Sequence, residues 1–369
     1  MIVIFSGFNQ RAVIAFLRTL KNNKVNDYRI VAASEQDSIF QTIYKDKVVY
    51  TRKKKQLYLN EFIDAIKCIV RGYGEEKCLI APSTEALNRF MLENRKVLED
   101  NQCIIPLVER NLYEEISDKE AFGSLCYCKG LDTPKLVGIS QFYSGPIVAK
   151  PRTYFSSEGK VFSPVIIQSK EQFEEFKRQY NTRDFIYQEY IDGESYYLLY
   201  YFTKEGEAYS FSQINYAQQP GGKSILAAEC SDLHYKEDIS DKYKMLFLEL
   251  GFSGFVMVEL RKNNGVYYMI EANPRFWGPA QLFCDAGYNL FERFLDEYGY
   301  IKKKKLGRIN YQAKYLWSGG FEGNVDQNEH CVWLGNGKEK VCQDIDLFME
   351  SDLYNRGDTM DVFYQEREN

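Results

Sequence analysis

The stretch "MIEANPRFWG", Met269 to Gly278, decides the fold of this chain. Its first half has the apolar character of a buried strand, yet the strand ends at Glu271, and Asn273 follows two residues later. Side chains of a strand alternate between its faces, so these two oxygen donors share a face if the extended backbone continues that far. A proline and an arginine come next, and then Phe276 and Trp277, whose size favours packing over substrate contact.

The stretch is the second half of a predicted β-hairpin. The segment "GFVMVELRKNNGVYYMIEAN" contains two apolar runs joined by "NNG", residues 263–265, which is a turn signal between strands. Glu259 and Glu271 flank this turn, on neighbouring strands. The register is uncertain by one residue, but these two carboxylates and Asn273 can converge.

The polar side chains of the hairpin have the chemistry of a magnesium site. Two carboxylates and an amide oxygen form a hard oxygen set, which suits Mg²⁺ and suits zinc badly. Mg²⁺ also keeps coordination positions open for the phosphates of a substrate. The alternative is a solvated hairpin end with ordinary surface acids. We therefore take Glu259, Glu271 and Asn273 as a hypothetical metal site that needs support from the rest of the chain.

The composition excludes several other kinds of protein. The chain has 369 residues, 45% hydrophobic and 27% charged, which is typical of a soluble globular protein with two or three domains. A net charge of −5 disfavours a general nucleic-acid-binding surface. With only two histidines, the chain has few candidate residues for a zinc site or a serine–histidine triad. Its nine cysteines include no CxxC pair, which indicates reduced thiols. There is no signal-peptide pattern and no apolar run long enough for a membrane span, so we expect a cytoplasmic protein.

The first part of the chain, residues 1–112, alternates apolar strands with amphipathic helices. This alternation indicates a parallel sheet with helices on both faces, as in a Rossmann-like domain. Loops that follow such strands bind ligands in open α/β sheets, so Gly7, Phe8 and residues 82–84 face a cleft unless they only turn the chain. The expected strands lie within residues 1–7, 28–34, 47–51 and 77–83, and the expected helices within 9–23, 59–74 and 84–99.

After about residue 112 the pattern changes to clustered strands with few helices, which indicates an α+β region. A helix is expected to begin near Ser117 or Asp118. The strand "GPIVAKP" ends at Lys150, where burial without an anionic partner would cost several kcal/mol. A lysine at a strand end that faces a cleft is a natural phosphate contact.

The order of these features resembles the ATP-grasp superfamily, and within it the branch of carbamoyl-phosphate synthase and biotin carboxylase. The resemblance covers roughly residues 113 to 300. Its most specific mark is the second metal-ligand strand, an acidic residue, a spacer and then Asn–Pro–Arg, which "EANPR" (271–275) matches. The resemblance implies a Rossmann-like domain over 1–112, an ATP-grasp domain over 113–310 with a small lobe (113–188) and a large lobe (189–310), and an extension over 311–369 that packs on the large lobe.

The resemblance also implies roles for the matching residues. Glu259, Glu271 and Asn273 would bind the metal, and Lys150 and Arg275 would be the catalytic groups. The backbone of the segment after the small-lobe strands would contact the edge of the adenine base, and Glu194 would bind the ribose. The residues implied to contact the nucleotide are Lys119, Lys150, Gln188, Glu189, Ile191, Glu194 and Ile270.

One loop departs from the family pattern, and a second loop has two alternative interpretations. After the Lys150 strand the family often has a glycine-rich loop over the phosphates. Here the loop, residues 152–164, has one glycine, although Arg152 and other polar side chains could still contact phosphate. The second loop, "QQPGGKS" (218–224), is either a segment that borders the acceptor site, as in related ligases, or a plain hairpin turn.

The family implies an ADP-forming ligase. ATP and one or two Mg²⁺ ions, for which Mn²⁺ can substitute, would activate a small-molecule carboxylate as an acyl phosphate, and an amine or similar nucleophile would then displace phosphate. A homodimer is common in this family, and neither a nucleic acid nor a membrane is expected as a partner. Two alternatives remain: a small-molecule kinase on the same fold, and a nucleotide-binding module without catalysis, against which the intact metal set argues.

Overall fold

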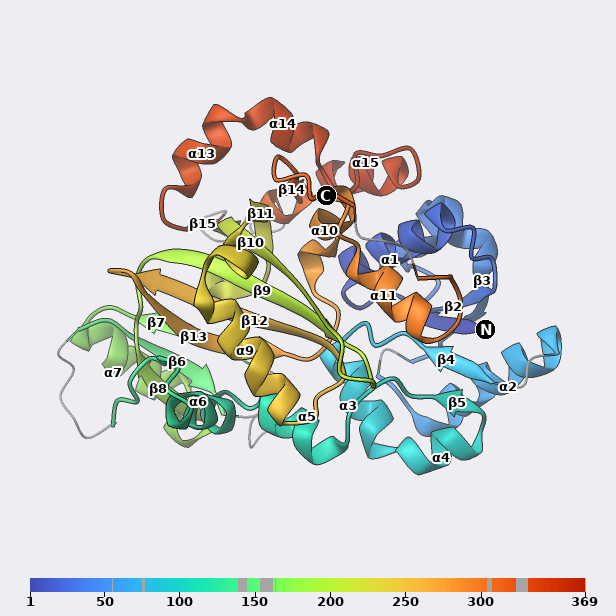
Figure 1. Ribbon diagram of the computed structural model, residues 1–369, viewed down its shortest axis with the longest axis horizontal. Coiled ribbons are helices and arrows are strands. Elements are labelled where there is room, and N and C mark those ends of the chain that lie inside the picture. Colours follow the sequence, from blue (N-terminus) through green and yellow to red (C-terminus); the bar gives the residue numbers. More distant parts are fainter. Residues whose placement is uncertain are drawn as a thin grey trace.

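The computed structural model describes residues 1–54, 56–74, 77–138, 145–152, 162, 164–303, 307–322 and 331–368. Within these residues the strands form three sheets, one at each end of the molecule and a large one between them (Figure 1). Most of the predicted loop over the phosphates, including Gly159, lies outside the described residues. No helix in the described part of the chain is both long and apolar enough to cross a bilayer.

The N-terminal sheet is parallel, with the strand order β3-β2-β1-β4-β5, as the alternating pattern predicts. Both faces of β1 are buried: Ile2 and Ile4 pack with α1, and Val3 and Phe5 pack with α2. The predicted helix over 84–99 is divided at Asn94. The elements are β1 (Ile2–Phe5), α1 (Gln10–Asn22), β2 (Tyr28–Ala32), β3 (Val48–Thr51), α2 (Leu59–Tyr73), β4 (Cys78–Ile80), α3 (Glu85–Glu93), α4 (Arg95–Asp100) and β5 (Cys103–Ile104).

A small antiparallel sheet, ordered β7-β6-β8, lies at the other end of the molecule. Phe176 of α7 closes one face of this sheet against Ile147 and Phe185. The carboxylate of Asp118 caps α6 by accepting hydrogen bonds from the backbone N–H groups of the first turn. The elements are α5 (Arg110–Ser117), α6 (Lys119–Cys128), β6 (Ile147–Pro151), β7 (Val165–Ile167), α7 (Lys170–Gln179) and β8 (Phe185–Glu189).

The central sheet has the order β13-β12-β9-β10-β11-β14, and β15 pairs with β10. One face packs on α5, α6 and α9, and the other packs on α1, α10 and α11, so the sheet lies between two helical layers. The elements are β9 (Glu194–Phe202), β10 (Ala208–Gln218), β11 (Ile225–Ser231), α8 (Leu233–Lys236), α9 (Asp238–Glu249), β12 (Gly254–Asn263), β13 (Val266–Asn273), α10 (Gln281–Asp285), α11 (Leu290–Glu297) and β14 (Lys314–Leu316).

The last segment of the chain contacts both the central sheet and the N-terminal part. Strand β14 extends the central sheet, while Arg18 of α1 forms a 2.8 Å ion pair with Asp358, which also accepts a hydrogen bond from Tyr44. Figure 1 shows α15 beside the blue N-terminal part of the chain. None of the nine cysteines forms a disulfide in the described part of the chain. The remaining elements are α12 (Gly319–Glu322), β15 (Val332–Trp333), α13 (Gly337–Gln343), α14 (Ile345–Glu350) and α15 (Met360–Glu368).

Candidate active site

The hairpin of β12 and β13 contains a register shift that the sequence did not reveal. Asn264 and Gly265 form its turn with positive φ values of 48° and 81°, for which Asn-Gly is the favoured pair. Pairing runs regularly from this turn to Leu260 and Met269. It then shifts by one residue, so that Glu259 lies opposite Glu271 and Met257 lies opposite Asn273.

Ile270 is the extra residue of this β-bulge. In the register that the turn sets, Glu259 would face Ile270, and Glu271 would point to the other side of the sheet. The bulge therefore places both carboxylates and Asn273 on one face. The carbonyl oxygen of Ile270 accepts a 3.1 Å hydrogen bond from Nζ of Lys150, which fixes this lysine against the same strand.

Glu271 is held in its ionised form by its neighbours. Nζ of Lys119 lies 3.0 Å from one carboxylate oxygen, and the amide nitrogen of Asn273 donates a 2.8 Å hydrogen bond to the other. Burial raises the pKa of Glu271, but the opposing effects of Lys119, Asn273 and Lys150 are larger and lower it to about 2. Lys119 thus contacts β13, the strand of the predicted metal ligands, and its own contact with phosphate stays a prediction.

The negative charge of Glu259 is balanced less well by its neighbours than that of Glu271. Burial raises the pKa of its carboxyl group, and the guanidinium of Arg261, 3.5 Å away, opposes this shift. The carboxylate of Glu271 also raises the pKa of Glu259, since the two negative charges face each other across the strands. A bound cation would relieve this repulsion.

The donor set fits a magnesium ion better than a fully protein-bound metal. No group of three or more His, Cys, Asp and Glu side chains that could hold a metal occurs in the described ranges. A cation at the hairpin would have two carboxylates and the amide oxygen of Asn273, and its other positions would be open to phosphate and water. The three predicted ligands stay a prediction that this arrangement supports.

Lys150 is almost completely buried, with 5% of its surface exposed. Burial and the neighbouring charge of Lys119 lower its pKa, the carboxylates of Glu271 and Glu259 oppose this effect, and the net result is a pKa of about 8. The buried strand end thus carries a cation whose anionic neighbours are the two predicted metal ligands.

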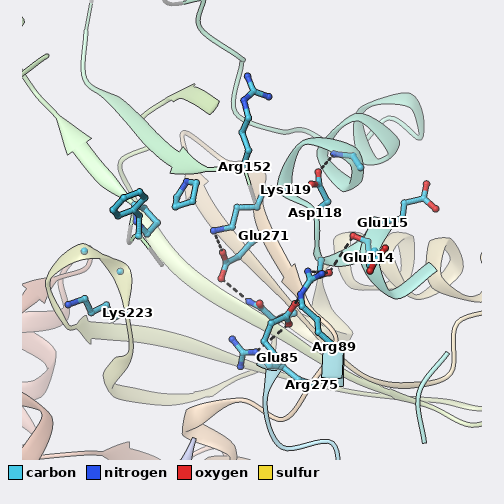
Figure 2. A pocket seen from close by; sticks show the side chains of 18 residues that line it. Glu85, Arg89, Glu114, Glu115, Asp118, Lys119, Arg152, Lys223, Glu271 and Arg275 are labelled. Carbon is cyan, nitrogen blue, oxygen red and sulfur yellow. Dashed lines mark hydrogen bonds and ion pairs between the residues drawn. The ribbon is translucent and has the colours of Figure 1, made fainter. Parts of the chain in front are cut away.

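A cavity of about 670 Å³ opens in front of β13. Figure 2 shows Lys119, Glu271 and Arg275 close together on one side of it, with Lys223 across from them on the loop that contains two glycines. The lining includes five acidic side chains and also five cationic ones, which are the candidate contacts for phosphate. The cationic side chains are Arg89, Lys119, Arg152, Lys223 and Arg275.

The predicted adenine and ribose contacts lie apart from this cavity and are not among its lining residues. Gln188 is 5% exposed, and its side-chain oxygen has no hydrogen-bond partner within the described ranges. Glu189 accepts a 3.0 Å hydrogen bond from the backbone of Lys135, and Glu194 accepts one from Tyr196. The orphaned oxygen of Gln188 fits the amino group of a bound base, while Ile191, which follows β8, stays a predicted contact.

No protein-family model and no curated protein sequence matches the chain, but solved structures do. The biotin carboxylase domain of 2-oxoglutarate carboxylase from Hydrogenobacter thermophilus, solved with MgADP, ADP and bicarbonate, is similar with a TM-score of 0.62 and 14% identity. The match covers 85% of this chain and 73% of that one.

Two further solved structures agree. A complex of biotin carboxylase from Campylobacter jejuni with a β,γ-ATP ligand matches with a TM-score of 0.60 and 12% identity, over 85% of this chain and 74% of that one. N5-carboxyaminoimidazole ribonucleotide synthetase from Thermus thermophilus matches with a TM-score of 0.57 and 15% identity, over 84% and 80%. This chain has the ATP-grasp fold. The predicted fold class, a Rossmann-like part followed by a two-lobed ATP-grasp part, is thereby confirmed.

The N-terminal part of this ATP-grasp chain supplies site residues that the sequence did not identify. Arg89 of α3 lies 2.7 Å from Glu85, whose other oxygen accepts a hydrogen bond from Tyr113 and lies 4.0 Å from Nε of Arg275. Glu85 and Arg89 directly follow the loop predicted to face a cleft. Their position after a strand end was a usable signal, but their side chains alone were typical of a helix surface.

A second cavity, of about 570 Å³, adjoins the first in this ATP-grasp fold. The two cavities share a wall made by Glu85, Gly222, Lys223, Glu271, Asn273 and Arg275. The second cavity reaches the loop after β1, where Phe8 to Arg11 lie, and the C-terminal residues Trp317 and Tyr354. The glycine loop at 221–222 therefore lies between the cavities.

Proposed function

We propose that this protein is an ATP- and Mg²⁺-dependent, ADP-forming ligase that activates a carboxylate as an acyl phosphate and joins it to an amine or similar nucleophile. One observation chiefly supports this proposal. The bulged hairpin places two carboxylates and Asn273 on one face, and Glu271, Asn273 and Arg275 form part of the wall between two adjacent cavities. The neighbours with the same fold include enzymes described with MgADP and bicarbonate.

In this proposal Glu259, Glu271 and Asn273 would hold one or two Mg²⁺ ions, and Mn²⁺ could replace them. A bound Mg²⁺ ion would supply positive charge against which the phosphates of ATP and the reacting carboxylate are brought together. Lys119 and Lys150 would bind the phosphates, and the backbone near Ile191 would read the base.

The two cavities would bind different substrates. The nucleotide phosphates would enter the first cavity, with its five cationic side chains, and the carboxylate would enter the second. Arg275 lines both cavities, so its guanidinium is placed to stabilise negative charge at the point where they meet. In this proposal both substrates would meet at the wall that the cavities share.

The chemistry requires no side-chain nucleophile. A carboxylate oxygen attacks the γ-phosphorus of ATP, and the bond to the bridging oxygen breaks, so that its electron pair leaves with ADP. The amine nitrogen then attacks the acyl carbon, the bond to phosphate breaks, and the amine proton passes to solvent. Closure around the acyl phosphate would exclude water that would otherwise hydrolyse it.

A substrate screen tests this function. The protein is incubated with MgATP, panels of carboxylic acids and an amino-acid mixture, and released phosphate and ADP are measured. We expect both products to appear together with a new amide, which mass spectrometry detects. Release of ADP with a stable phosphorylated product would instead identify a kinase, and absence of ADP formation together with absence of MgADP binding would contradict the proposal.

Replacement of Lys150 by alanine is expected to weaken ATP binding by roughly tenfold to a hundredfold, since a charge-assisted contact to phosphate would be lost. Titration calorimetry with MgADP measures this effect. Lys129→Ala is the matched control, because Lys129 pairs with Glu249 on the exposed surface. An unchanged nucleotide affinity in Lys150→Ala would remove this lysine from the phosphate site.

We also propose the domain bounds given by the resemblance: 1–112, 113–188, 189–310 and 311–369. A cytoplasmic location is supported by nine cysteines that form no disulfide in the described part of the chain. A homodimer is supported by the neighbour from Hydrogenobacter thermophilus, which is described as a domain dimer. Light scattering of the purified protein tests the oligomeric state directly.

A further inference from the structure

The second cavity contains an arginine that the proposed reaction does not use. Arg11 lies in the first turn of α1 and lines this cavity. Its guanidinium donates hydrogen bonds to the carbonyl of Ile225 (3.0 Å), the hydroxyl of Tyr315 (3.3 Å) and the hydroxyl of Ser224 (2.8 Å). Since a guanidinium has five N–H donors, these three bonds leave two for a ligand.

All hydrogen-bond partners of Arg11 are neutral. No carboxylate within the described ranges lies at ion-pair distance from it. The guanidinium instead stacks on the ring of Trp317, with a distance of 4.1 Å to the ring centroid. A Cβ atom at Gly278 would lie 2.6 Å from its Nη2 atom, so the glycine provides the space that the guanidinium fills. The positive charge is therefore fixed in place by neutral groups and forms no ion pair in the described part of the chain.

Two of the three carboxylates of this cavity pair with cations: Glu271 with Lys119 at 3.0 Å, and Glu85 with Arg89 at 2.7 Å. The third, Glu366, accepts a 3.0 Å hydrogen bond from the neutral indole of Trp317, so its charge offsets one cation of the lining. Lys223 is exposed and has no ion-pair partner in the described part of the chain. Arg11, Lys223 and Arg275 therefore stand against Glu366 alone, and this balance favours an anionic ligand.

Two further hydrogen-bond donors of the cavity lining lack partners. Trp277 is 1% exposed, and its indole nitrogen has no hydrogen-bond partner within the described ranges. The side-chain nitrogen of Gln10 is buried and also has no partner there. Buried donors normally have partners, and two orphaned donors in one lining indicate acceptors that arrive with a ligand.

We propose that the carboxylate substrate carries a second anionic group, which Arg11 and Lys223 recognise. The cavity runs from the shared wall at Glu271 and Arg275 to the Arg11–Trp317 pair, and its 570 Å³ is ample for a small dianion. The carboxylate to be activated lies at the shared wall, and the second group, a carboxylate or a phosphate, lies at Arg11. Trp317 belongs to the C-terminal segment, so this segment helps to select the substrate. The inference rests on the proposed ligase function.

Ligand binding can be measured without turnover. Two of the three tryptophans, Trp277 and Trp317, line the cavity, so intrinsic fluorescence reports on its occupation. In the presence of MgADP the protein is titrated with succinate, glutarate and 3-phosphoglycerate, and with the matched monoanions succinamate, glutaramate and glycerate. At least one dianion is expected to bind tenfold or more tightly than its matched monoanion. The carboxylate and phosphate pairs show which second group is preferred.

Variants assign the preference to the two cations. Arg11→Met and Lys223→Gln are each expected to weaken dianion binding about tenfold and to leave monoanion binding unchanged. Arg11 lines only the second cavity, so Arg11→Met should also leave the affinity for MgADP unchanged. Lys223 lines both cavities, so Lys223→Gln is compared at saturating MgADP, where the lost preference for the dianion over its matched monoanion is the result expected. Lys223→Gln keeps the experiment decisive if Arg11→Met does not fold, because Lys223 is exposed. Arg29→Met is the control, since Arg29 stacks on Tyr73, which lines neither cavity.

Several results would overturn the inference: no saturable binding of any dianion, equal affinity for every matched pair, or wild-type dianion affinity in both cavity variants. These results are distinguishable from failure of the proposed function. If MgADP does not bind, the ligase proposal fails. If MgADP binds and the dianions show no preference, only the inference about the substrate fails.

Discussion

Replacement of Glu271 by glutamine is expected to lower ATP turnover by about a thousandfold or more while the protein stays folded. Glutamine keeps the shape of the side chain and can accept the hydrogen bond from Asn273, but it lacks the charge on which cation binding depends. Loss of several kcal/mol of charge stabilisation in the transition state corresponds to a factor of this order. The ion pair with Lys119, 3.0 Å long, is lost as well.

Phosphate release under saturating MgATP measures this effect for the substrate found in the screen. Glu99→Gln is a matched control, because Glu99 is a half-exposed acid in an i,i+4 pair with Arg95, away from both cavities. Circular dichroism checks that both variants fold. Turnover within tenfold of the wild type in Glu271→Gln would refute the metal site at the hairpin.

Replacement of Phe276 by alanine is expected to destabilise the protein by about 3–5 kcal/mol. Phe276 has 0% of its surface exposed. Its ring centroid lies 5.3 Å from that of Phe16 in α1, 5.0 Å from that of Phe255 in β12 and 4.6 Å from that of Phe291 in α11. The substitution opens a cavity where the N-terminal part, the central sheet and a covering helix meet, and rigid elements cannot collapse into it.

Urea unfolding measures the loss of stability. Tyr127→Ala provides the comparison, because Tyr127 is 74% exposed on α6 and its removal should change the free energy of unfolding by less than about 0.5 kcal/mol. A change below about 1 kcal/mol in Phe276→Ala would show that this ring is not a packing centre. The prediction that Phe276 packs rather than contacts a substrate would then be wrong.

Trp277 is a different case from its neighbour. It is as buried as Phe276, but it also lines the second cavity, and its indole nitrogen lacks a partner in the described part of the chain. The sequence favoured packing for both aromatic residues. Only the position of the second cavity distinguishes the two rings: Phe276 packs in the core, whereas Trp277 packs there and also lines the cavity.

Much of the fold could be predicted because its signals are local. The alternation of apolar strands and helices before residue 112 follows from spacing within each segment, and it predicted the parallel N-terminal sheet. The Asn264–Gly265 pair predicted the hairpin, because few residues adopt the positive φ values of such a turn. The segment Glu271 to Arg275 identified the fold family because several residue types occur there in a fixed order.

Other features depend on contacts across the chain, and these no local pattern reveals. The bulge at Ile270 settled the register that the turn left uncertain by one residue. Asn9 donates a hydrogen bond to the backbone of Phe276, 267 positions away, and so helps to place the loop after β1 beside the candidate site. Glu85 and Arg89 join the site for the same reason.

By itself the sequence determined the element types, the ATP-grasp fold and the residue types at the hairpin, since periodicity, turn chemistry and motif order are properties of neighbouring residues. Only the tertiary structure decided that Glu259 faces Glu271, that Lys119 pairs with Glu271, and that Arg11 and Trp317 meet in one cavity. These contacts depend on the path of the whole chain, because a shift of one residue in a strand reverses the face on which a side chain lies.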